Sequence, residues 1–191
     1  MPITTTLDAS APVIRLTGEI DLAVSYALLD EINLLHDYYQ FRDVSLHIDS
    51  LGGSADALHF LVHALTPWRK GQGRVLRTFG VNQVASAAAM LLSFGTVGYR
   101  TASRNSRLLY HSVRVVPQGN SMHTVAQLRV ATRSLELWDR RFVDLLVEHT
   151  LQTKDISETA IYRRKLSRLM RRDRVISPEQ AKDMKLIDQV V

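Results

Sequence analysis

The amino-acid sequence predicts an α/β fold of repeated βαβ units around a mostly parallel sheet. Short apolar runs of strand length alternate with amphipathic segments of helix length along the first half of the chain. This alternation favours parallel strands, because each intervening helix returns the chain to the starting edge of the sheet. A second observation is a much longer helical periodicity further on, which predicts one long helix.

The individual elements follow from apolar spacing and from the residues that begin or end each run. The expected strands are Val13–Leu16, Val44–Ile48, Arg74–Phe79, Val97–Thr101 and Leu108–Ser112. The expected helices are Asp21–His36, Ser54–Leu65 and a segment that begins at Ser86 and runs through Leu92. Between the second helix and the third strand, the stretch Thr66–Arg74 is interpreted as a surface loop.

Two helical segments are expected in the last third of the chain. Apolar residues from Thr124 to His149 fit a helix of roughly seven turns, which is longer than one small core requires. Seven basic residues lie between 163 and 174, but Leu166, Leu169 and Met170 are spaced to bury one helical face. We therefore expect a solvated or subunit-facing surface there and no nucleic-acid partner, since no helix-turn-helix, zinc finger or aromatic platform accompanies the basic run.

The length and composition of the chain limit which classes of protein it can belong to. The length of 191 residues predicts a single domain over 1–191, with residues 1–12 as a short N-terminal segment. No apolar window reaches membrane-spanning length and no signal-peptide pattern is present, so we expect a cytoplasmic protein without membrane contact. The absence of cysteine excludes disulfides and thiolate chemistry.

Metal and cofactor sites are not expected. His59 and His63 are four residues apart on one helix, but Phe60 stands where a zinc peptidase motif needs glutamate. His47 and Asp49 share one face of a strand without an evident third ligand. No phosphate-binding motif occurs either, so any use of ATP has to come from a partner.

Four sequence features supply the candidate catalytic residues, although each feature taken alone more often has a structural role than a catalytic one. Ser86 lies among small apolar residues at a helix start, Gly52 and Gly53 follow an apolar strand, His111 ends another strand, and Asp173 stands between arginines. In this order, Ser86, His111 and Asp173 supply a nucleophile, a base and an orienting acid. Backbone N–H groups of Gly53 and Ala87 are then the expected oxyanion donors.

This ordered set resembles the proteolytic subunit of the Clp protease over roughly residues 13 to 191. The fragments that carry the resemblance are Thr17-Gly18-Glu19-Ile20, Ile48-Asp49-Ser50-Leu51-Gly52-Gly53, Gln83-Val84-Ala85-Ser86, Ser106-Arg107-Leu108-Leu109-Tyr110-His111, Arg172-Asp173-Arg174-Val175-Ile176-Ser177-Pro178-Glu179-Gln180-Ala181 and Leu186-Ile187-Asp188.

The resemblance implies a Clp protease/crotonase-like fold with a protruding handle helix, the handle region covering about 113–149. It implies a serine endopeptidase that cleaves peptides or unfolded polypeptides inside an oligomeric chamber, as a homo-oligomer of one heptameric ring or two stacked rings. Substrate would lie as an added strand along Gly52, Ser54, Ser112 and Val113, and Arg114–Met122 would line this groove and take part in ring contact.

The sequence also departs from the family pattern. Ala87-Ala88 replace the usual Met-Gly after the nucleophile, and Leu51 replaces the usual proline before Gly52. Only residues 1–12 precede the first expected strand, which argues against docking to an AAA+ unfoldase while leaving the chemistry intact.

Two alternatives remain open at this point. One is a catalytically idle Clp-like scaffold that joins rings with an active relative. The other is an acyl-CoA enzyme of the crotonase superfamily, whose oxyanion hole also uses two backbone N–H groups and in which Ser86 would be incidental.

Overall fold

The computed structural model describes residues 2–7, 12–70, 73–114, 124–151, 153 and 155–191. The chain forms two compact units, one of residues 1–110 with 175–191 and one of residues 111–174. The expected single domain over 1–191 stays a prediction. Within the described residues, no helix combines the length and apolar character needed to cross a membrane.

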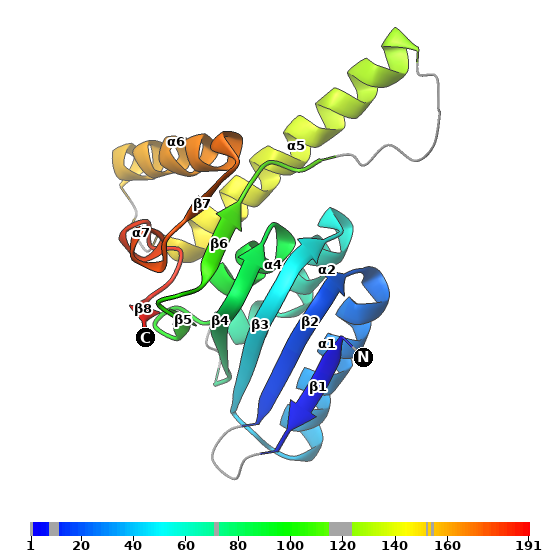
Figure 1. Ribbon diagram of the computed structural model, residues 1–191, viewed down its shortest axis with the longest axis vertical. Helices are drawn as coiled ribbons and strands as arrows, with labels where there is room; N and C mark the ends of the chain where they lie inside the picture. The colour runs from blue at the N-terminus through cyan, green and yellow to red at the C-terminus, as the bar shows by residue number, and fades with distance from the viewer. Residues whose placement is uncertain (1, 8–11, 71–72, 115–123, 152, 154) are drawn as a thin grey trace. The chain divides into compact units, whose positions relative to one another are not determined.

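The first unit is built on a sheet with the strand order β1-β2-β3-β4-β5-β8, in which β6 pairs with β4 and β7 pairs with β6 (Figure 1). The strand β1 pairs with β2 in antiparallel orientation, whereas the β2–β3, β3–β4, β4–β5, β4–β6 and β5–β8 pairs are parallel. The strands are Ile3–Thr6 (β1), Val13–Ile20 (β2), Asp43–Gly53 (β3), Val75–Ala85 (β4), Arg100–Ala102 (β5), Arg107–Tyr110 (β6), Arg174–Ile176 (β7) and Gln189–Val190 (β8). The predicted α/β class with a mostly parallel sheet is thus confirmed.

Three helices of this unit lie on one face of the sheet (Figure 1). They are α1 (Leu22–Asn33), which continues into a π-helical turn at Leu34–Tyr38, α2 (Ala55–Ala64) and α4 (Ala87–Ser93); two shorter helices are α3 (Thr66–Arg69) and α7 (Pro178–Asp183). Asp21 caps α1 by accepting the N–H of Val24 at 2.7 Å. The alternating burial of β3 shows that every second side chain enters the core beneath the helices.

Two segments of this unit differ from the sequence-based expectation. The expected strand Val13–Leu16 is present as the first half of β2, but an additional strand, Ile3–Thr6, precedes it, and the β-branched run of this strand pairs with β2 along the sheet edge. Part of the expected loop at Thr66–Arg74 is helical, because Trp68 is buried and its carbonyl oxygen accepts the Thr96 hydroxyl at 2.6 Å.

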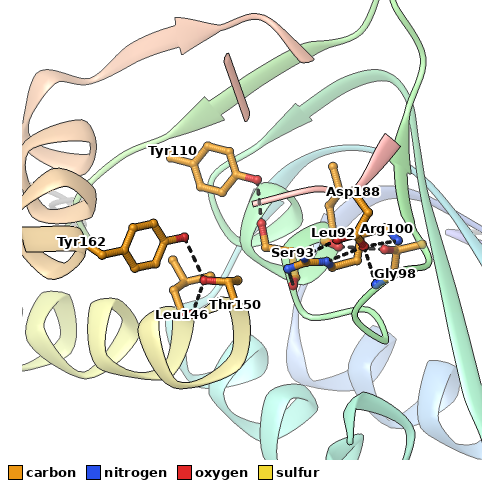
Figure 2. Close-up of polar contacts among 10 residues, drawn as sticks. Leu92, Ser93, Gly98, Arg100, Tyr110, Leu146, Thr150, Tyr162 and Asp188 are labelled. Atoms are coloured by element: carbon orange, nitrogen blue, oxygen red, sulfur yellow. Dashed lines mark hydrogen bonds and ion pairs between the residues drawn. The ribbon is translucent and has the colours of Figure 1, made fainter. Parts of the chain in front are cut away.

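A buried ion pair ties the C-terminal strand to the sheet (Figure 2). The Arg100 side chain is 2% exposed, and its Nη2 and Nε donate to the two Asp188 carboxylate oxygens at 2.6 and 2.9 Å. The N–H groups of Gly98 and Arg100 donate to the same carboxylate. Asp188 therefore holds the chain just before β8 against the start of β5.

The second unit consists mainly of α5 (Val125–Thr150) and α6 (Ile156–Arg172). Thr124 and Gln127 form a capping box at the start of α5, so the predicted long helix begins where expected. Leu166, Leu169 and Met170 of α6 are buried, as their spacing predicted. Near the end of α5, the Thr150 hydroxyl contacts the Leu146 carbonyl and the Tyr162 hydroxyl at 2.7 and 2.8 Å (Figure 2).

Candidate active site

Ser86 occupies the single position between β4 and α4 in a backbone conformation that is rare for a residue with a side chain. Its φ of 58° and ψ of −127° lie outside the common regions, and its hydroxyl makes no capping hydrogen bond to the helix. The Ser86 N–H donates instead to the Leu109 carbonyl of β6 at 2.8 Å. A serine on a strained strand-to-helix turn is a geometry that hydrolases use to expose a nucleophile.

Gly52 lies directly against this turn, and the strand that carries it extends beyond the expected Val44–Ile48. Gly52 and Gly53 both belong to the end of β3, where Gly52 pairs with Glu19 and Gly53 with Ile20 of β2. Gly52 has a φ of +98°, and a Cβ at this position would lie 2.7 Å from the Ser86 Cβ. Only glycine allows this close approach of β3 to the Ser86 turn.

The expected oxyanion and substrate residues of the first unit lie around the same point. A Cβ on Gly52 would also approach the Ala87 N at 2.9 Å, and Ala87 begins α4, where the N–H groups have no partner within the helix. Gly53 is packed tightly against the backbone of Ile20. The Ser54 hydroxyl caps α2 by accepting the Ala57 N–H at 3.3 Å. Gly52, Ser86 and Ala87 are therefore brought together.

His111 and Asp173 both belong to the second unit, where each already has another partner. The His111 Nδ1 donates to the Ser112 carbonyl oxygen at 2.6 Å. Asp173 ends α6 in a left-handed conformation, and its carboxylate forms an ion pair with Arg114. In a working triad the imidazole Nδ1 donates to the acid, so this arrangement has to rearrange before it can support catalysis.

The residues after His111 are held by both helices of this unit. The Ser112 N–H donates to the Met170 carbonyl at 3.1 Å, and the Val113 N–H donates to the Asp139 carboxylate at 2.7 Å. Asp139 was not among the predicted site residues, because nothing in a helical sequence shows which side chain reaches a distant backbone group. Most of the expected groove segment Arg114–Met122, from residue 115 onward, lies outside the described residues.

The histidines considered as metal ligands have other surroundings. The Nε2 atoms of His59 and His63 are 3.0 Å apart. The pKa of His47 is lowered by burial and by the charge of Arg15, and its ring packs against Phe79. Among the residues that the structure describes, no three histidine, aspartate or glutamate side chains gather as metal ligands. Asp49 instead accepts the Gln83 N–H at 3.0 Å and so links β3 to β4.

Comparisons with known proteins find similarity over nearly the whole chain. The family described as Clp protease matches residues 3–191. The chain is 30% identical over 182 residues to "ATP-dependent Clp protease proteolytic subunit 2" of Corynebacterium glutamicum, covering 95% of this chain and 82% of that protein. It is 31% identical over 179 residues to proteolytic subunit 3 of Frankia casuarinae, covering 94% and 76%. For proteolytic subunit 1 of Thermobifida fusca the identity is 30% over 173 residues, covering 91% and 71%.

The chain belongs to the Clp protease family. Membership of this family supports a serine peptidase function, as the resemblance implied, and favours it over an acyl-CoA enzyme of the crotonase type. The particular catalytic residues stay predictions that rest on the geometry described above.

Proposed function

We propose that this chain is a serine endopeptidase that cleaves peptides or unfolded polypeptides with Ser86, His111 and Asp173 as its catalytic residues. The observation that carries the proposal is the strained turn at Ser86 with Gly52 packed against it. A backbone in this conformation persists only where surrounding structure enforces it, and such strain is concentrated at functional sites.

The reaction begins when His111 removes the Ser86 hydroxyl proton and the serine oxygen attacks the peptide carbonyl carbon. Negative charge then develops on the carbonyl oxygen, and the N–H groups of Gly53 and Ala87 stabilise it, each by about 3 kcal/mol. Asp173 orients the imidazole and stabilises its protonated form. His111 next protonates the leaving amine, and water completes the cycle by hydrolysing the acyl-enzyme.

Substrate would add as a strand beside the end of β3, along Gly52 and next to Ser54. The N–H groups of Ser112 and Val113, the other two expected substrate-binding residues, are already used within the second unit. Backbone hydrogen bonds from these two N–H groups to substrate would therefore require the segment to rearrange together with His111. This requirement links substrate binding to the alignment of the catalytic histidine.

The proposal includes assembly into a homo-oligomer of one or two heptameric rings in the cytoplasm. The relatives are named as proteolytic subunits of an ATP-dependent protease, which supports assembly and a partner that hydrolyses ATP. Apolar side chains of α5 are exposed in the described chain, including Val125, Leu128 and Val130. No metal or cofactor takes part in the proposed chemistry.

A second candidate is an idle scaffold subunit, and a specific observation favours it. The His111–Ser112 hydrogen bond and the Arg114–Asp173 ion pair occupy the atoms that the triad needs. If these contacts persist in the assembly, the chain would contribute to a ring without cleaving substrate.

Labelling with a fluorophosphonate, followed by intact-mass measurement, tests the peptidase proposal. We expect one adduct on the native protein and none on Ser86→Ala, because only an activated serine reacts with this reagent. An adduct that survives in Ser86→Ala would show that another residue is the nucleophile. No adduct on the native, assembled protein would favour the idle scaffold.

Arg114→Gln tests whether the ion pair with Asp173 restrains the site. Both side chains are about half exposed, and an exposed pair contributes at most about 1 kcal/mol, so the labelling rate should rise by up to about fivefold. Arg164→Gln, which removes an exposed arginine from α6, is the matched control. Equal rates in both variants would contradict a restraining role for Arg114.

A further inference from the structure

A cavity of about 590 Å³ opens in the first unit beside the Ser86 turn. It adjoins Gly52, the residue that packs against Ser86. The apolar side chain of Leu51 lines the cavity. The polar side chains that line it are Glu19, Asp49, Ser50, Asn82 and Gln83. The cavity is therefore positioned to receive a substrate side chain that lies close to the bond being cleaved.

Irregular strand pairing forms this cavity at the ends of three neighbouring strands. The β2–β3 register shifts between Thr17 and Glu19, and the β3–β4 register shifts between Ile48 and Ser50. Gly18, at the first shift, has a φ of +80°. Such irregularities redirect side chains and are common next to active sites. As a result of these two register shifts, the acidic residues Glu19 and Asp49, which belong to adjacent strands, line the same cavity.

The cavity carries an excess of negative charge. One oxygen of the half-buried Asp49 accepts the Gln83 N–H, whereas the exposed Glu19 has no ion-pair partner among the described residues. No lysine, arginine or histidine occurs among the described residues that line it. A cavity of about 540 Å³ in the second unit differs, since its acidic residues are matched by arginines in pairs such as Arg163–Asp144 at 2.8 Å.

We propose that the cavity beside Gly52 is a specificity pocket for a lysine or arginine side chain of the substrate, an assignment that rests on the proposed peptidase function. Two carboxylates on one cavity attract a cation and repel an acidic side chain. The exposed Leu51 offers an apolar surface for the methylene stem of a long basic side chain. Glu19 and Asp49 are then specificity residues, distinct from the catalytic ones.

The test uses a set of peptides in which a single residue is varied. That residue is lysine, glutamine or glutamate, and it is placed in turn at each of three positions on either side of the scissile bond. Binding of the labelled peptides to Ser86→Ala, measured by fluorescence anisotropy, reports the pocket without catalysis. At one position, we expect the lysine peptide to bind at least tenfold more tightly than the glutamate peptide. The ratio of the two affinities should approach one when Glu19→Gln and Asp49→Asn are added. Adding Asp30→Asn, an exposed acid on α1, should leave the ratio unchanged.

The same peptides, cleaved by the protein with Ser86 intact, separate the two proposals. The ratio of the lysine-peptide to the glutamine-peptide cleavage rate should fall toward one when Glu19→Gln and Asp49→Asn are added, whereas adding Asp30→Asn should leave this ratio unchanged. Equal binding of lysine and glutamate peptides at every position would overturn the pocket assignment, even if fluorophosphonate labels Ser86. Selective binding without any labelling would support the pocket and reject the peptidase proposal.

Discussion

Ser86 and Gly52 lie against each other, and both have backbone conformations that most residues avoid. Gly52 achieves its positive φ without strain because it lacks a Cβ, whereas Ser86 adopts one with a side chain present. The small neighbours of Ser86 in the sequence indicated a position that a substrate could approach. They did not show the sign of φ, because the long-range contacts with β3 and β6 enforce it.

Gly52→Ala should destabilise the protein more than a glycine-to-alanine substitution at a position with open space around it. A Cβ would meet the Ala85 carbonyl oxygen at 2.6 Å in addition to the strain of a positive φ, so we expect the free energy of unfolding to fall by about 3 kcal/mol. Urea unfolding measures this loss, and fluorophosphonate labelling of Ser86 should slow more than tenfold.

Gly98→Ala is the matched control for that change. Gly98 has a similar φ of +92°, but nothing lies within 4 Å of the position its Cβ would occupy. We therefore expect only the strain of the left-handed region, about 1 kcal/mol, and no change in labelling. Equal losses of stability in the two variants would show that the contact between Gly52 and the Ser86 turn is unimportant.

At the scale of elements, the ends of strands and helices depend on contacts more than on local preference. The strand β3 continues through Gly52 and Gly53 because β2 pairs with it there, although two glycines in sequence are typical of a turn. The strand β8 has only two residues, and it is held by β5 together with the Arg100–Asp188 ion pair just before it.

Asp188→Asn should weaken this attachment strongly. The substitution leaves the buried Arg100 guanidinium without its counter-charge, and loss of one partner of a buried pair costs roughly 3 kcal/mol. Thermal or urea unfolding measures the effect. Asp183→Asn, at the end of α7, removes an acid for which no comparable ion pair is described and should change stability by less than about 0.5 kcal/mol. Equal stability of the two variants would contradict an anchoring role for Asp188.

The same ion pair predicts how stability changes with pH. Burial would raise the pKa of Asp188, but the hydrogen bonds and charge of Arg100 and the Gly98 N–H outweigh it and hold this pKa below its usual value. A depressed carboxyl pKa contributes stability that is complete above the pKa of the unfolded chain and is lost as the pH falls. We expect the free energy of unfolding to decrease below about pH 4, and to decrease less steeply in Asp188→Asn. Parallel pH profiles would show that other carboxyl groups control acid unfolding.

At the scale of the whole molecule, α5 has two different halves. Its second half is buried at Phe142, Val143 and Leu145, whereas residues 124–134 are all exposed, including the apolar Val125, Leu128 and Val130. Side chains this exposed bury little apolar surface within the monomer. Their presence on a 26-residue helix supports the proposed oligomer.

Leu128→Asp tests this role of α5 in assembly. The side chain is 52% exposed, so we expect an unchanged unfolding transition for the separated monomer but a smaller assembly by native mass spectrometry. Ser134→Asp adds the same charge at an exposed polar position of the helix and should preserve the assembly. If both variants assemble like the native protein, the exposed apolar residues of α5 are not part of the subunit contact.

The sequence by itself determined the α/β class, the main helices and the family of this protein. It could do so because apolar periodicity, capping residues and short ordered motifs are local signals, and Ser86, Leu166 and Thr124 carry such signals. The tertiary structure alone decided the strain at Ser86, the approach of Gly52, the partner of Asp173 and the two acids on one cavity. These features arise between residues distant in sequence, where strand register and close packing set the geometry, and no local pattern encodes either.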